Sequence, residues 1–132
     1  MPPLSRWYIK LAILYFIGAM IVGLLQAALH LSYLSPAYVH MLVVGWVTQM
    51  IFGVAYWMFP KFSPEKPRGD SPIAIATLIL LNAGLLLRII AEPLRAARPD
   101  VAPGWLLVVA GAAQALAGIG FALNTWPRVK VR

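Results

Sequence analysis

The chain has 132 residues, of which 61% are hydrophobic and only 11% are charged, with a mean hydropathy of +0.80. This composition excludes an ordinary soluble protein, fits a single domain, and leaves room for about four apolar runs of membrane-spanning length. The absence of cysteine excludes disulfides, thiolate metal ligands and thiol catalysis. A net charge of +7 would suggest nucleic acid in a soluble protein, but these cations lie near the ends of apolar runs. We therefore expect a lipid bilayer, and not nucleic acid, as their partner.

The first apolar segment covers residues 7–31. Its apolar run is too long for the hydrophobic region of a signal peptide, so we expect a retained spanning helix. Ala19, Gly23, Gln26 and His30 recur at helical spacing on one face. Small residues on that face permit close packing, and Gln26 can hydrogen-bond to another helix.

The second segment, residues 36–59, begins with Ser35 as a predicted N-cap and Pro36 at the first helical position. His40 follows about one turn into the helix, and an ionisable ring at that depth is costly unless it has a use. The link from the first segment is only a few residues long, which makes the two helices antiparallel neighbours. We therefore expect His30 and His40 at the same membrane face.

The third and fourth segments cover residues 72–92 and 105–126. Arg88 lies near the end of the third helix, and Glu92 follows one turn later on the same face. Pro93 is expected to end this helix. The fourth segment is rich in glycine and alanine, which favours tight contacts between helices.

Polar residues inside the spans predict contacts between helices. We expect Gln49, Asn82 and Gln114 to hydrogen-bond across helices. Gly45, Gln49 and Gly53 recur at every fourth position of the second helix and indicate a packing seam.

The distribution of cations predicts the orientation. Two basic residues, Arg95 and Arg98, follow the third helix, and Arg88 lies inside it. Eight lie at the N-terminus, in the second link and at the C-terminus, namely Arg6, Lys10, Lys61, Lys66, Arg68, Arg128, Lys130 and Arg132. Because cytoplasmic segments carry the excess of Lys and Arg, both termini are expected in the cytoplasm. The sequence thus predicts an all-α membrane protein, with four transmembrane helices in an antiparallel bundle in a bacterial inner membrane.

Few residues could carry chemistry. Carboxylate-based acid–base catalysis has no obvious groups, because no two acidic residues pair within a span. His40 is either a ligand to haem iron or an interfacial histidine that reaches headgroup water. His30 is either a second ligand or a wet loop-edge residue. Arg88 either pairs with Glu92 or binds a haem propionate, with Arg95 as a helper.

Residues of the second helix also carry a family resemblance. His40, the run Gly45-Trp46-Val47, residues 50–56 and the ending Phe59-Pro60 resemble the second transmembrane helix of the catalytic subunit of haem–copper oxidases. The resemblance is closest to cbb3-type oxidases, nitric oxide reductases, and short four-helix proteins described as cbb3-type oxidase subunit I-like. It implies that His40 is an axial ligand of a haem b near the outer face.

The histidine count limits what the resemblance implies. With two histidines in all, the chain cannot hold a haem–copper dinuclear site, so we expect no copper and no oxidase activity of its own. Neighbouring helices lie about 8–10 Å apart, which is tight for a haem held between His30 and His40. The second ligand is therefore either His30 or a histidine of a second subunit. We expect a haem b protein that transfers electrons within an oligomer or a larger respiratory complex. An open axial position would instead allow gas binding. The alternative function is a cofactor-free accessory subunit of a membrane complex.

Overall fold

The computed structural model describes residues 1–69 and 71–129, so that Lys130 and Arg132 of the cation count lie outside the described residues. Within these ranges the chain is helical without strands. Four helical stretches are long and apolar enough to cross a membrane: Pro3–Leu29, Ser32–Met58, Ser71–Ala97 and Trp105–Arg128. These stretches confirm the predicted all-α class and the four spanning helices.

The first span is the single helix α1 (Pro3–Leu29). It ends at His30, whose backbone is left-handed with φ of 53° and whose N–H bonds to the carbonyl of Gln26. A left-handed residue at this point is a common way to end a helix. The chain then turns through the short 3₁₀ helix η1 (Ser32–Leu34) into the second span.

The second span is not a uniform α-helix. It consists of α2 (Ser35–His40), a π-helical segment η2 (Met41–Thr48) and α3 (Gln49–Met58). At its end, the N–H of Gln49 reaches the carbonyl of Val44, five residues earlier. Such wide turns are rare and occur often at functional sites. The segment starts directly after His40 and separates α2 from α3. Its wider turns therefore change the direction of the His40 side chain relative to the side chains of α3.

The third span, α4 (Ser71–Ala97), continues through Pro93, so the prediction that Pro93 ends the helix is wrong. A proline removes one backbone donor and crowds the carbonyl four residues earlier. Only four residues follow it here, and the N–H of Arg98 closes the last turn on the carbonyl of Leu94 at 2.7 Å. The helix therefore lacks one backbone hydrogen bond near its end and continues past it. The last span contains α5 (Trp105–Thr125) and the 3₁₀ turn η3 (Trp126–Arg128).

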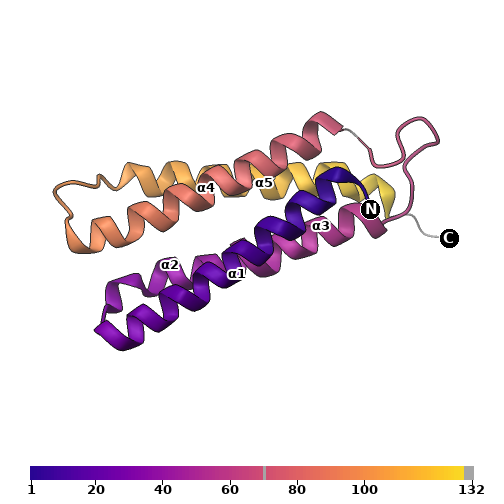
Figure 1. Ribbon diagram of the computed structural model, residues 1–132. Coiled ribbons are helices and arrows are strands. Elements are labelled where there is room, and N and C mark those ends of the chain that lie inside the picture. Colours follow the sequence, from indigo (N-terminus) through magenta and orange to yellow (C-terminus); the bar gives the residue numbers. More distant parts are fainter. Residues whose placement is uncertain (70, 130–132) are drawn as a thin grey trace.

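The four spans pack as two pairs. Figure 1 shows α1 lying along α2 and α3, and α4 lying along α5. Glycine permits the close approach within each pair: a Cβ on Gly53 would lie 2.7 Å from Tyr8, and one on Gly84 would lie 2.8 Å from the carbonyl of Ala110. The predicted packing seam of the second span is thus confirmed. Between the pairs, Phe52 and Phe121 stack with ring centroids 3.8 Å apart.

The polar residues inside the spans differ in their hydrogen-bond partners. Gln26 donates to the hydroxyl of Ser35 at 2.6 Å, and the fully buried Gln49 donates to a backbone carbonyl of α1 at 3.5 Å, as predicted. Asn82 bonds instead to a carbonyl one turn earlier in its own helix, so the predicted contact between helices is wrong there. A carbonyl of the same helix is always within reach of such a side chain, whereas a partner on another helix depends on packing. The amide nitrogen of Gln114 has no partner among the described residues.

Candidate functional site

His40, Arg88 and Glu92 form one cluster, which we call the outer cluster because α2 lies at the end of the bundle away from the N-terminus (Figure 1). His40 ends α2, and the other two residues are four positions apart on α4, so their side chains share one helix face. Nδ1 of His40 lies 3.1 Å from Oε2 of Glu92, and Nε2 lies 3.0 Å from Nη1 of Arg88. Arg88 and Glu92 also pair directly at 3.5 Å, as the sequence predicts.

The partners of the His40 ring assign its proton. Nδ1 faces two acceptors, the carbonyl of Pro36 at 2.8 Å and the carboxylate of Glu92. Nδ1 therefore carries the hydrogen. Nε2 faces the guanidinium of Arg88, which can only donate, so Nε2 accepts with its lone pair. These contacts fit the tautomer with its hydrogen on Nδ1, which has its metal-binding lone pair on Nε2.

The outer cluster balances its charges in a partly buried place. The side chains of His40, Arg88 and Glu92 are 26%, 21% and 11% exposed. One guanidinium and one carboxylate sum to zero, which lowers the cost of holding both near an apolar bundle. Gly111 of α5 makes room, because a Cβ there would lie 3.0 Å from Nη2 of Arg88. The cluster therefore joins α2 to α4 and is closed in by α5.

The other two predicted site residues lie apart from this cluster. His30 is exposed at the end of α1, and its side chain has no hydrogen bond or ion pair with any described residue. Arg95 donates to the carbonyl of Ala102 at 3.1 Å, and its guanidinium lies against Gly104. Arg95 thus secures the connection between α4 and α5. The structure brings His40 and Arg88 together with Glu92, and it does not bring in His30 or Arg95.

The His40 ring fits one axial ligand of a haem. Histidine ligands are normally oriented by a hydrogen bond from the second ring nitrogen to a carbonyl or carboxylate, and both acceptors are present at Nδ1. No group of three or more histidine or acidic residues that could hold a metal ion occurs in the described part of the chain. A haem iron needs only one or two protein ligands. Nε2 would be open to an iron only if the N–H of Arg88, now 3.0 Å away, moved from it.

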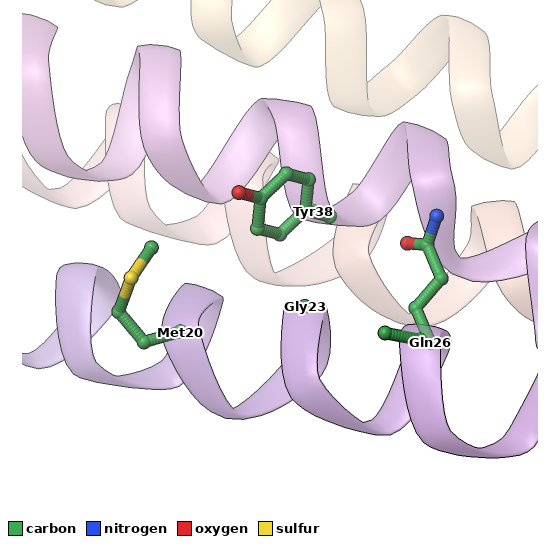
Figure 2. A pocket seen from close by; sticks show the side chains of 5 residues that line it. Met20, Gly23, Gln26 and Tyr38 are labelled. Atoms are coloured by element: carbon green, nitrogen blue, oxygen red, sulfur yellow. The ribbon is translucent and has the colours of Figure 1, made fainter.

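A separate pocket of about 390 Å³ lies between α1 and α2 (Figure 2). The ring of Tyr38 lies over Gly23, where a Cβ would be 3.0 Å from the ring. Gln26 crosses toward α2, and its Oε1 is buried without a partner among the described residues. The small-residue face predicted for the first helix thus forms one wall of this pocket.

Arg128 is a buried residue that sequence reasoning counted only as a cytoplasmic cation. It is 0% exposed and donates to the carbonyls of Tyr56, Phe59 and Pro60 at 2.9–3.0 Å. These are the carbonyls left over where the second span ends. The sequence held one signal: that span ends without the glycine that commonly caps a helix, so its last carbonyls needed another donor.

No protein-family model, curated protein or solved structure matches this chain. The resemblance around His40 therefore stays a prediction from the sequence.

Proposed function

We propose that this protein is a membrane-embedded haem b-binding protein that transfers electrons within a homo-oligomer or a larger respiratory complex. His40 is the axial ligand. The observation that carries the proposal is the set of contacts of its ring: Nδ1 lies against the carbonyl of Pro36 and the carboxylate of Glu92, an arrangement that leaves the lone pair on Nε2. The resemblance of the second span to haem-binding helices supports the same residue.

We place the protein in the bacterial inner membrane as an antiparallel bundle with both termini in the cytoplasm. The excess of cations at the termini and in the link after the second span supports this orientation. In it, the outer cluster and His30 face the periplasm. The haem then lies near the outer surface, where an electron partner can approach.

The residues of this chain would hold the haem in distinct ways. The haem itself supplies one-electron chemistry at its iron. His40 binds the iron, and Arg88 binds a propionate in place of its present bond to the ring. Arg95 can help only by giving up its bond to Ala102. The second axial ligand is His30 or a histidine of a second copy, because the outer cluster contains a single histidine.

The test is the visible spectrum of protein purified from cells with adequate haem. A reduced-minus-oxidised spectrum should show a b-type α band, and the haem-to-chain ratio should be one haem per chain or per pair of chains. His40→Ala should abolish the band while the protein stays monodisperse. His30→Ala is the matched variant: it loses the band only if His30 is the second ligand. A folded wild-type protein without an α band would sink the proposal.

A second candidate function is a cofactor-free accessory subunit. One observation favours it: both ring nitrogens of His40 already have partners within the chain, so the cluster can serve as a link between α2 and α4. In that case, His40→Gln should leave the spectrum unchanged and lower only the stability of the bundle. Loss of an α band in that variant would exclude this alternative.

A further inference from the structure

The largest of the pockets described here lies at the end of the molecule opposite the outer cluster. Its volume is about 910 Å³, and it is bounded by the start of α1, the end of α3, the loop that follows and the start of α4. Figure 1 shows these segments together at the end marked N. The volume is within the range of sites that bind small molecules. Nothing proposed for the haem uses this pocket.

The floor of the pocket is apolar. Leu4 of α1, Ile75 and Leu78 of α4 and the buried Tyr56 of α3 line it. Ile75 is 48% exposed, although it lies in a span that faces either protein or lipid. A hydrocarbon chain lying along these residues would cover them.

The mouth of the pocket is basic. Among the described residues, Lys66 and Arg68 line it together with one acidic residue, Glu65. Arg68 uses one N–H on the carbonyl of Trp57 at 3.1 Å, and its other guanidinium donors bond to no other described residue. Lys10 adds a third cation nearby, because its ammonium lies 5.9 Å from the ring of Trp7, which also lines the pocket.

The apolar floor and the basic mouth of the pocket match the two parts of a phospholipid, its acyl chains and its charged headgroup. Trp7 is 58% exposed, as expected of an aromatic residue at the membrane interface. Basic residues at this level attract anionic headgroups. We propose that the pocket binds one anionic phospholipid, with its phosphate at Lys66 and Arg68 and an acyl chain along Leu4 and Ile75. A free phosphate would leave the apolar floor uncovered.

The experiment is native mass spectrometry of the full chain in detergent, titrated with phosphatidylglycerol or phosphatidylcholine. We expect one phosphatidylglycerol to be retained at least fivefold more strongly than phosphatidylcholine. Lys66→Gln should lower that retention about fivefold, since a cation near a membrane surface contributes about 1 kcal/mol. Lys61→Gln is the control, because it removes a cation of the same loop that does not line the pocket.

A second variant tests the floor without changing charge. Ile75→Trp fills the apolar part, so it should reduce retention of both lipids while the helical content measured by circular dichroism stays the same. Equal retention of the two lipids by the wild type, or an equal loss in Lys61→Gln, would overturn the proposal. Displacement of the lipid by millimolar inorganic phosphate would also overturn it, because the site would then recognise phosphate alone. None of these readouts depends on haem.

Discussion

Replacing Arg128 by alanine should destabilise the bundle more than the loss of any other single cation. The side chain is fully buried, and its three hydrogen bonds join η3 to the end of α3. Its guanidinium carbon also lies 5.6 Å from the ring of Tyr56. The substitution removes all these contacts between segments that are 68–72 residues apart in the sequence.

The contacts suggest the size of the effect. A hydrogen bond to a charged group contributes about 1.5–3 kcal/mol, so three would give an upper limit of about 9 kcal/mol. The real loss is smaller, because the freed carbonyls can regain water near the membrane surface and the desolvation cost of the guanidinium disappears. A buried carbonyl left without a donor costs about 1–3 kcal/mol, and we expect a total loss of about 3 kcal/mol in the free energy of unfolding. Arg128→Lys keeps the charge but lacks the forked set of donors, so it should lower the free energy of unfolding by about half as much as Arg128→Ala.

The assay is reversible unfolding in detergent by titration with sodium dodecyl sulfate, followed by circular dichroism. Arg6→Ala is the matched control, since Arg6 is exposed in the first turn of α1 and its loss should change the free energy of unfolding by about 0.5 kcal/mol at most. An Arg128→Ala variant as stable as Arg6→Ala would refute the reasoning.

Three further changes test the packing. Gly53→Ala sets a methyl group 2.7 Å from a side-chain carbon of α1 and should cost about 1–3 kcal/mol of unfolding free energy, whereas Gly118→Ala, with no atom within 4 Å, should be neutral or stabilising. A double-mutant cycle on Gln26 and Ser35 should give a coupling energy of about 0.6 kcal/mol, and zero coupling would contradict the 2.6 Å bond. Pro93→Ala restores a backbone donor within α4 and should raise the free energy of unfolding in the same titration, and an unchanged or lower value would contradict the loss of a hydrogen bond at Pro93.

The sequence predicted the spans because hydrocarbon leaves backbone groups no partner but their own helix. The length and position of each apolar run then determine which residues form a spanning helix. The same logic found the seam at Gly45 and Gly53, since only small residues allow two helix backbones to approach. The pair of Arg88 and Glu92 was also predictable, because four residues separate neighbours on a helix face. Each of these features depends on spacing within one segment.

Several other features, which depend on how distant segments are placed relative to one another, escaped prediction. A cation count treats Arg128 and Lys61 alike, although the first is fully buried and the second is exposed. The π-helical segment after His40 has no spacing signature, because its widened turn depends on packing against the rest of the bundle. The contact of His40 with α4 likewise required the relative placement of α2 and α4, which the short link between the first two spans does not determine.

In the proposed haem site, the iron and the guanidinium of Arg88 would compete for one atom, Nε2 of His40. Arg88 donates to this atom at 3.0 Å, so iron can bind there only after the guanidinium has moved. A propionate gives Arg88 a charged acceptor in exchange for the imidazole. Arg88→Gln should therefore weaken haem binding tenfold or more, since a charged hydrogen bond contributes about 1.5–3 kcal/mol. If Arg88 only shields the nitrogen, its removal would strengthen haem binding instead. Titration of the apoprotein with haem decides the sign, with Arg98→Gln as the control because that side chain is 65% exposed.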